Sequence, residues 1–181
     1  MVSKEIELLA MNCSCRSPKD PNECDVCFEP VCKKCALKPS PDAFKYQPEV
    51  AETLKKDRYC SRCFDAEVAP ALARYEEILD RAKNVTFLTN AFKGHLPILK
   101  RAKTEVEIEG VLDRDELILR LGYLAAEAGF NSLIRSEVVS KKIRNEAYQK
   151  SEWSGYGTPA LLDEKKFKIQ EEREEAYRRG K

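Results

Sequence analysis

The sequence contains little of what defines several large classes of protein. It has one histidine and one tryptophan in 181 residues, and no cysteine follows Cys63. No apolar run approaches the ~18–20 residues that a membrane-spanning helix needs. The first ten residues combine acidic side chains with only a short apolar stretch, which is not the pattern of a secretory signal. We therefore expect an intracellular, cytoplasmic protein.

Net charge is also nearly absent. The chain has 32 Lys and Arg residues against 31 Asp and Glu residues, a net charge of +1, and the two signs are balanced along its length. Because an electrostatic nucleic-acid binder needs an excess of basic side chains, we expect no nucleic-acid partner. No phosphate-binding loop is present, and His95, the lone histidine, has no identifiable nucleophile or orienting partner. The sequence therefore predicts a protein that is not an enzyme.

The strongest feature that is present is a set of eight cysteines, arranged as four short-spaced pairs. Four disulfides would need an oxidising compartment, which no signal peptide indicates. A close pair of cysteines instead points two thiolates at one metal ion, and two such pairs complete a tetrahedral shell. We therefore predict two zinc ions, bound by Cys13, Cys15, Cys24, Cys27, Cys32, Cys35, Cys60 and Cys63.

Both zinc sites would be structural, because sulfur fills every ligand position and leaves none for water or substrate. The cysteine segment has few large apolar residues, so metal binding would supply much of its folding free energy. Spacing alone does not decide which cysteine pairs bind the same zinc ion. The second and third pairs either serve different ions in an interleaved cross-brace or share one ion.

Two stretches of this segment resemble the core of a FYVE-type zinc finger. Residues 24–35 read Cys-Asp-Val-Cys-Phe-Glu-Pro-Val-Cys-Lys-Lys-Cys, and residues 58–63 read Arg-Tyr-Cys-Ser-Arg-Cys. The related PHD fingers usually carry histidine where this chain has Cys32, and RING fingers have a shorter gap between the middle pairs. The resemblance covers residues 13–80 and implies the cross-brace. In that arrangement Cys13, Cys15, Cys32 and Cys35 bind one zinc, and Cys24, Cys27, Cys60 and Cys63 bind the other.

The chain departs from the FYVE pattern where that family binds its ligand. FYVE domains bind phosphatidylinositol 3-phosphate through a basic, histidine-containing cluster around the third cysteine. Here Glu23 and Asp25 flank Cys24, and they would repel a phosphate. We therefore do not expect a membrane lipid as ligand. Phosphoinositide binding, peptide-tail binding by analogy with PHD fingers, and ubiquitin transfer by a cross-brace finger remain as alternatives to the main interpretation.

The rest of the chain has alternating helix and strand patterns. Apolar spacing predicts a helix over 66–83 with Pro70 in its first turn. Strands are expected over 84–89 and 104–111, the latter with Glu105, Glu107 and Glu109 on a solvated face. Asp113 is placed to cap a helix that ends at Gly129, with Leu117, Leu121, Leu124 and Ala128 facing inward. Two strands, 130–143 and 147–162, would follow, and Trp153 and Tyr156 are expected to pack on the sheet.

The order of these elements from residue 85 is β-β-α-β-β, which favours a small antiparallel sheet with one helix on a face. The segment is similar to a family of small bacterial β-β-α-β-β domains described as heavy-metal-binding. Residues 124–134 and 155–159 carry this resemblance. It implies a sheet domain that forms rings, so a homo-oligomer is one of the expected states.

Together these patterns predict an α+β protein made of four segments. A two-zinc finger spans 1–65, a connecting helix 66–84, a small sheet domain 85–162, and a charged, solvated helical tail 163–181. The expected function is that of a zinc-binding, non-catalytic adaptor whose finger or sheet contacts a protein partner.

Overall fold

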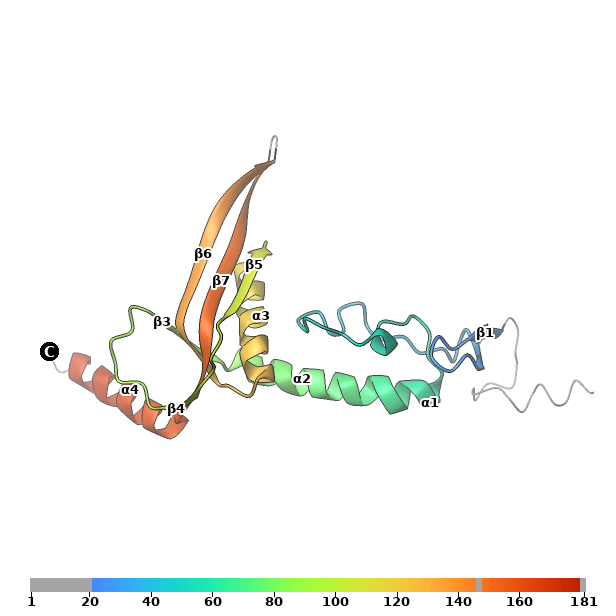
Figure 1. The fold of residues 1–181 in the computed structure, drawn as a ribbon, viewed down its shortest axis with the longest axis horizontal. Coiled ribbons are helices and arrows are strands. Elements are labelled where there is room, and N and C mark those ends of the chain that lie inside the picture. Colours follow the sequence, from blue (N-terminus) through green and yellow to red (C-terminus); the bar gives the residue numbers. More distant parts are fainter. Residues whose placement is uncertain (1–20, 146–147, 180–181) are drawn as a thin grey trace, which may run out of the picture. The chain divides into compact units, whose positions relative to one another are not determined.

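The computed structural model describes residues 21–145 and 148–179. The chain divides into two compact units, Met1–Glu76 and Glu77–Lys181, and the boundary falls inside helix α2. Helices and strands both make up large parts of the chain, so the α+β prediction is confirmed (Figure 1). Among the described residues, no helix combines the length and apolar character that crossing a bilayer requires.

The first unit is built from turns and short elements. Strands β1 (Pro21–Glu23) and β2 (Pro30–Cys32) form an antiparallel hairpin, and η2 (Glu52–Leu54) is a short 3₁₀ helix. Leu37 and Tyr59 form an isolated bridge, in which each N–H donates to the carbonyl of the other at 2.9 and 3.0 Å. Three of the six residues in the buried cluster of this unit are cysteines. The cluster comprises Cys24, Val31, Tyr59, Cys60, Cys63 and Val68.

The helix predicted over 66–83 begins earlier, at Ser61. It runs without a break through α1 (Ser61–Cys63), a π-helical segment η3 (Phe64–Val68) and α2 (Ala69–Lys83). Pro70 therefore lies inside the helix and not in its first turn. Because proline has no N–H to donate, the helical hydrogen-bond pattern is interrupted near it, and the wider π-helical segment lies directly before α2.

The second unit is a five-stranded sheet with two helices. The strand order is β3-β6-β7-β4, and β5 also pairs with β7. The predicted antiparallel pairing is found where β4, β5 and β6 pair with β7, but the sheet is mixed because β3 is parallel to β6. Helix α3 lies between them in sequence and provides the crossover that a parallel pair requires. The strands are β3 (Thr86–Thr89), β4 (Ile98–Arg101), β5 (Val106–Val111), β6 (Ser132–Asn145) and β7 (Tyr148–Leu162).

Strand β4 lies between the two predicted strands, 84–89 and 104–111, in a segment where the sequence pattern indicates no strand. All four of its residues are exposed, so it lacks the burial that makes a strand recognisable in sequence. It pairs with the end of β7 at an edge of the sheet, and its register is broken between Ile98 and Lys100.

Helix α3 (Arg114–Glu127) covers one face of the sheet and follows the sequence pattern closely. Asp113 caps it by accepting a hydrogen bond from the Asp115 N–H at 2.9 Å. Gly129 ends it with a φ of +81°, a conformation that favours glycine. Leu117 and Leu121 are fully buried. Two other predicted inward positions are less covered, since Leu124 is half-buried and Ala128 is exposed at the C-cap.

Helix α4 (Glu164–Arg179) occupies the segment predicted as a solvated tail. In its first turn Glu164, Lys165 and Lys166 are exposed, but Phe167 is buried. It packs in a cluster with Leu88, Ile134, Ala160 and Leu162 of the sheet. The Phe167 ring also lies 6.2 Å from that of Phe92, measured between centroids. The start of the charged tail is therefore part of the second unit.

Candidate metal centre

The β1–β2 hairpin presents the first two cysteines of the centre. Between the strands, the Phe28 N–H donates to the Cys24 carbonyl at 2.9 Å, and the Cys24 N–H donates to the Glu29 carbonyl at 2.9 Å. These two bonds close a tight turn. Residue 28 is left-handed there, with a φ of +60°. The turn places the thiols of Cys24 and Cys27 on one side of the hairpin.

The second pair, Cys60 and Cys63, lies at the start of the long helix. Cys60 caps α1, because its Sγ accepts a hydrogen bond from the Cys63 N–H at 3.4 Å. The two pairs are tied together just outside the cluster by Asp25 and Arg58. The Asp25 carboxylate accepts from the Arg58 N–H and from its guanidinium, both at 3.0 Å, and the Asp25 N–H donates to the Arg58 carbonyl at 2.9 Å.

The four sulfur atoms converge closely enough to hold one metal ion. Those of Cys24, Cys27, Cys60 and Cys63 all lie within 4.8 Å of one another, and the Cys27 and Cys60 sulfurs are 3.7 Å apart. None of the four forms a disulfide. The Cys60 N–H also donates to the Cys24 Sγ at 3.3 Å, the kind of outer contact that orients a metal ligand. This is the one such group among the residues that the structure describes.

The thiols differ in how readily they ionise. Burial raises the pKa of Cys24, but the backbone N–H groups of Cys27, Cys60 and Val26 stabilise its thiolate and lower its pKa to about 6. Burial raises the pKa of both Cys60 and Cys63, and neighbouring cysteines raise that of Cys63 further. Without a cation Cys24 thus ionises more readily than Cys60 and Cys63, because several negative charges cannot be held so close together. A bound cation removes that conflict.

Metal binding near pH 7 is expected to release about two or more protons per ion. Cys60 and Cys63 have raised pKa values in the folded unit and would be protonated in an unfolded one as well. Lowering the pH therefore weakens binding, because protons compete with the metal for the sulfurs. Calorimetric titration with zinc chloride in two buffers of different ionisation enthalpy measures the protons released. An affinity that stays constant between about pH 6 and pH 8 would contradict the expectation.

The other predicted zinc ligands are placed only in part. Cys32 is buried at the end of β2 and Cys35 is half-buried. They form a tight turn, in which the N–H groups of Cys35 and Ala36 donate to the Cys32 carbonyl at 3.0 and 2.9 Å. Cys13 and Cys15 lie outside the described residues. A second centre made from these four cysteines therefore stays a prediction.

Two neighbours of the centre were not anticipated from the sequence. Arg62 forms an ion pair with Glu29 at 3.1 Å. The charge of Glu29 and a hydrogen bond to Cys27 both raise the Arg62 pKa, so a fixed positive charge lies beside one sulfur. The second neighbour is Phe28, whose ring is 71% exposed. Its position directly after a Cys-x-x-Cys pair is a usable sequence signal, because the chain turns back there.

The second unit offers weaker candidates. His95 is exposed in the loop between β3 and β4. Glu105, directly before β5, is exposed, as are Glu107 and Glu109 on the strand. Tyr156 is half-buried and donates to Glu137 Oε2 at 2.6 Å. Glu137, followed by Glu105 and Glu107, raises the Tyr156 pKa.

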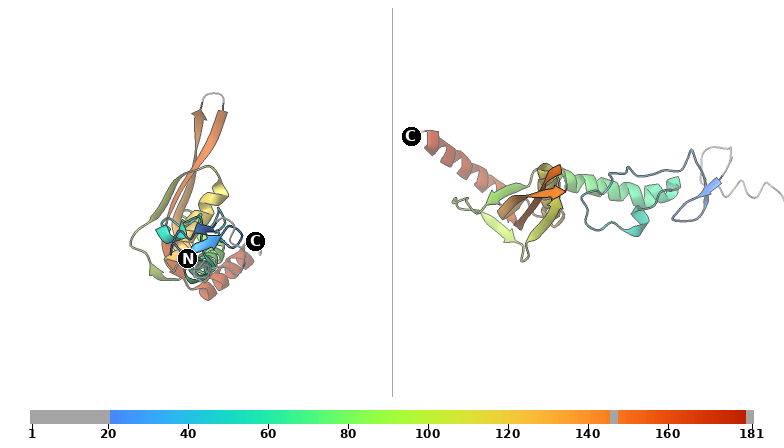
Figure 2. Two further views of the ribbon diagram at one scale, coloured as in Figure 1. Left: turned by 90° about the vertical axis from the view of Figure 1, so that its right-hand side faces the viewer. Right: turned by 90° about the horizontal axis from the view of Figure 1, so that it is seen from above.

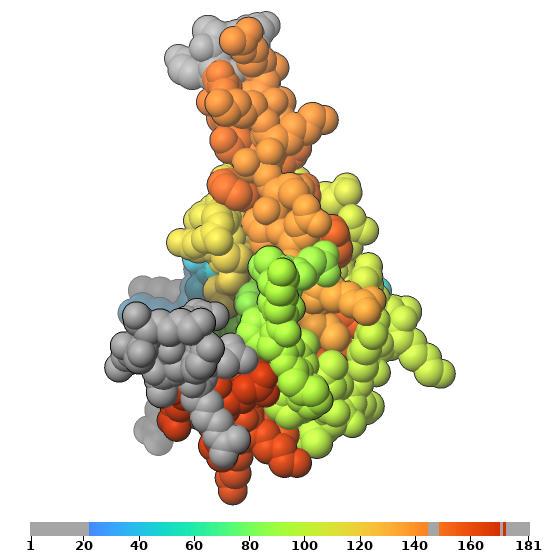
Figure 3. All heavy atoms as spheres, turned by 90° about the vertical axis from the view of Figure 1, so that its left-hand side faces the viewer, coloured from blue at the N-terminus to red at the C-terminus, as the bar shows by residue number. Residues whose placement is uncertain are grey.

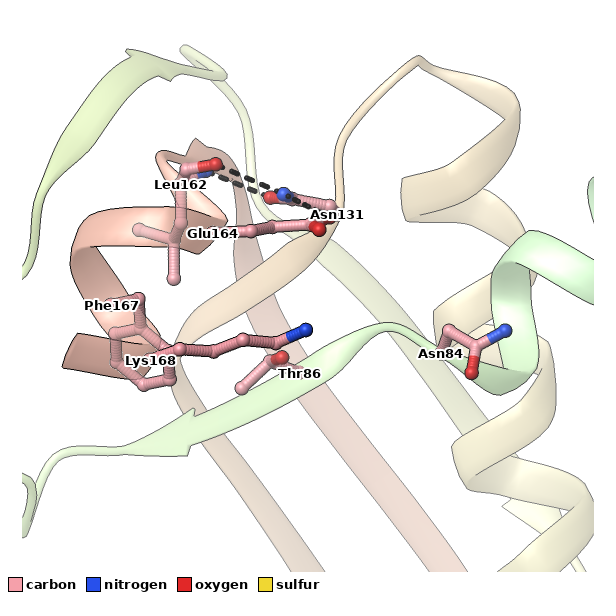
Figure 4. Close-up of a pocket in the computed structure, with 7 residues that line it drawn as sticks. All are labelled: Asn84, Thr86, Asn131, Leu162, Glu164, Phe167 and Lys168. Atoms are coloured by element: carbon pink, nitrogen blue, oxygen red, sulfur yellow. Dashed lines mark hydrogen bonds between the residues drawn. The ribbon is translucent and has the colours of Figure 1, made fainter. Parts of the chain in front are cut away.

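A cavity of about 420 Å³ lies between β3 and α4. Figure 4 shows Lys168 extending past Thr86 toward Asn84. The Asn131 amide is occupied by Leu162, donating to its carbonyl at 3.0 Å and accepting from its N–H at 2.8 Å. The charged groups that remain, Lys168 and Glu164, have opposite signs and favour no single ligand class.

The metal centre is therefore the strongest candidate site. Comparisons of the chain with protein-family models, curated proteins and solved structures found no match.

Proposed function

We propose that the first unit is a zinc-stabilised, non-catalytic module that binds a protein partner and serves as an adaptor. The closed cluster of four thiols and the exposed ring of Phe28 support this proposal. The zinc ions would act as scaffold, and the partner would contact the surface that they hold in place. The interleaved wiring of FYVE-type fingers is the arrangement we infer for the two ions.

Sulfur geometry and ligand chemistry support zinc as the metal. Zinc bonds to thiolate sulfur at about 2.3 Å in a tetrahedral shell, which places neighbouring sulfurs about 3.8 Å apart. The 3.7 Å between the sulfurs of Cys27 and Cys60 fits that spacing. We infer a second zinc on Cys13, Cys15, Cys32 and Cys35 from the same ligand chemistry and from the turn at Cys32. Four sulfur ligands leave no position for a reacting water, which favours a structural role.

The backbone conformation and the exposed ring of Phe28 are the main support for a protein partner. A left-handed backbone costs a residue with a side chain about 1–2 kcal/mol, and the Phe28 ring recovers little of that cost by packing because most of it faces solvent. Glycine would satisfy the turn better. Strain of this kind persists where it serves function. A rigidly presented aromatic ring is a common anchor at protein interfaces.

The charges around Phe28 favour a protein partner over a phosphoinositide. Glu23 is exposed, and Glu29 pairs with Arg62. Arg58 is held by Asp25 through its guanidinium. Two arginines beside the centre, Arg58 and Arg62, are thus paired with carboxylates, which reduces the positive charge that they offer to a phosphate headgroup.

Replacing Phe28 by glycine is expected to abolish partner binding without loss of the metal centre. The substitution removes the ring and relieves the left-handed strain, while glycine's greater freedom in the unfolded chain offsets part of the gain. The thermal stability of the zinc-loaded unit should therefore stay the same or rise slightly. Phe28→Ala keeps the strain and removes only the ring, so it should lose the partner and gain no stability.

Quantitative pull-down from an extract of the source organism tests this, with Leu112→Ala as the matched control. Leu112 is 63% exposed and belongs to the second unit. Support requires the same proteins to be retained by the wild type and the Leu112 variant and lost from both Phe28 variants. If all four proteins retain the same set, Phe28 is not the anchor.

A further inference from the structure

The β6–β7 hairpin extends well beyond the sheet that it belongs to. Strand β5 pairs with β7 only as far as Trp153. Beyond that point, residues 141–145 pair solely with residues 148–152. Figures 1 and 2 show this ribbon reaching past the ends of β5 and α3, and Figure 3 shows it as a narrow column. At about 3.4 Å per residue, five residue pairs make an arm of roughly 17 Å.

The rest of the sheet contributes little to the stability of this arm, because the arm pairs only with itself. A two-stranded ribbon is marginally stable by itself in water, and strands of 14 and 15 residues are far longer than the sheet needs. On this arm, Lys141, Lys142, Ile143 and Arg144 are all exposed on β6. A binding partner would explain why the two strands continue past their support.

Cations dominate the arm. Among its described residues, Lys141, Lys142, Arg144 and Lys150 are cationic, and Glu152 at its base is the one acidic side chain. Glu146 lies outside the described residues. Within the described part of the chain, none of these four cations has a carboxylate within ion-pair distance. Charge of either sign would keep the exposed strand edges from pairing with other chains, so edge protection alone does not account for the choice of cations.

The register assigns two of these cations to one face. Residues directly opposite each other on antiparallel strands share a face, and faces alternate along each strand. Lys142 lies opposite Ser151, and Arg144 lies opposite Gln149. This face of the arm thus combines two cations with hydroxyl and amide groups, and none of the four side chains described on it is acidic. The groups on it suit the oxygen atoms of a phosphate backbone.

We propose that the β6–β7 arm binds duplex DNA by entering the major groove, with Lys142 and Arg144 as its main phosphate contacts. A B-form major groove is about 12 Å wide and 8.5 Å deep and admits a two-stranded ribbon, and the arm is longer than that depth. The deep, narrow major groove of duplex RNA would exclude it. This function is separate from that of the metal centre.

The balanced composition of the chain does not oppose the proposal, because the fold separates the charges. Two exposed acids of the second unit, Glu107 on β5 and Glu137 on β6, both pair with Tyr156 of β7 on the supported part of the sheet. The cations lie on the projecting part. Screening limits the effect of distant charges to about 10 Å at 0.1 M salt, so the local charge of the arm decides whether DNA binds.

The test is fluorescence anisotropy of a labelled DNA duplex of about 24 base pairs with the full-length, zinc-loaded protein. We expect a Kd on the order of 10 µM or tighter at about 50 mM salt. Four phosphate contacts would weaken binding roughly 150-fold between about 50 and 200 mM salt, at about 0.9 counterions per contact. The double variant Lys142→Glu with Arg144→Glu should lose at least about half of that salt dependence and bind more than about tenfold more weakly.

The matched control is Lys93→Glu with Lys103→Glu, which makes the same charge change at exposed loop positions of the same unit. It should bind DNA nearly as well as the wild type, and circular dichroism should show both variants folded. Equal loss in both double variants would attribute binding to net charge and overturn the proposal. So would the absence of DNA binding at low salt, equal affinity for duplex RNA, or binding only to vesicles rich in anionic lipid.

Discussion

Removal of the metal is expected to unfold the first unit and leave the second unit folded. The buried cluster of the first unit contains three of the four sulfur ligands, and its fully buried apolar residues are only Val31, Tyr59 and Val68. The hairpin that holds Cys24 and Cys27 has strands of three residues each. A unit with so little apolar core is therefore expected to depend on a bound metal ion for its stability.

The size of this effect follows from the energetics of structural zinc. Zinc binding contributes roughly 10–16 kcal/mol in small zinc domains near neutral pH, which exceeds the whole stability of most domains. The second unit has its own buried core, which includes Leu117, Leu121 and Leu133. Chelation should therefore unfold the first unit only. The residues that lose their structure should lie before α2 in the sequence, and the second unit should stay folded.

Hydrogen exchange measured by mass spectrometry, before and after treatment with a strong zinc chelator, tests this expectation. Peptides from 24–63 should lose protection, and peptides from 132–145 should keep it. Elemental analysis should find about two zinc ions per chain, and Cys60→Ser should lower that number by about one. Ser61→Ala is the matched control, because it changes the adjacent residue and should leave the zinc content unchanged. Protection of residues 24–63 that survives complete metal removal would refute the scaffold role.

Local patterns in the sequence anticipated much of what the structure contains. The cap at Asp113 and the stop at Gly129 each depend on a few adjacent residues, so their chemistry is visible in sequence. The same holds for the Cys-x-x-Cys turns, and the four clustered cysteines are two such pairs. The alternation of Val106 and Ile108 with exposed glutamates on β5 also follows from a period of two.

Features that depend on distant residues were not predictable. The parallel pairing of β3 with β6 is a contact between segments more than 40 residues apart, such as Thr86 with Ser132. The burial of Phe167 depends on a pocket formed by four other segments, and nothing in its own charged surroundings indicates it. Charge balance along the chain likewise hid the separation of cations and acids, because pairing register decides which side chains share a face.

Gly122→Ala is expected to destabilise the second unit by about 2 kcal/mol, although alanine is the better helix former. Gly122 is buried in α3, and a Cβ at this position would lie 2.7 Å from the Ala82 carbonyl oxygen at the end of α2. The alanine gains about 1 kcal/mol of helix propensity. Overpacking usually costs about 1–3 kcal/mol. We expect a cost of about 3 kcal/mol here, at the top of that range, because a backbone carbonyl cannot move aside as a flexible side chain can. The clash therefore outweighs the propensity.

Gly129→Ala is the matched control, because the same methyl group meets no atom within 4 Å there. Its cost comes only from the left-handed φ of +81° and is about 1–2 kcal/mol. Gly122→Ala thus measures the cost of a steric clash, and Gly129→Ala measures the cost of backbone strain. Gly122→Leu should then cost much more than Gly122→Ala, while Gly129→Leu should cost about the same as Gly129→Ala. In thermal unfolding of the second unit, each kcal/mol shifts Tm by roughly 4–8 °C. A Gly122→Ala protein as stable as the wild type would mean that α2 and α3 do not approach as closely as the fold requires.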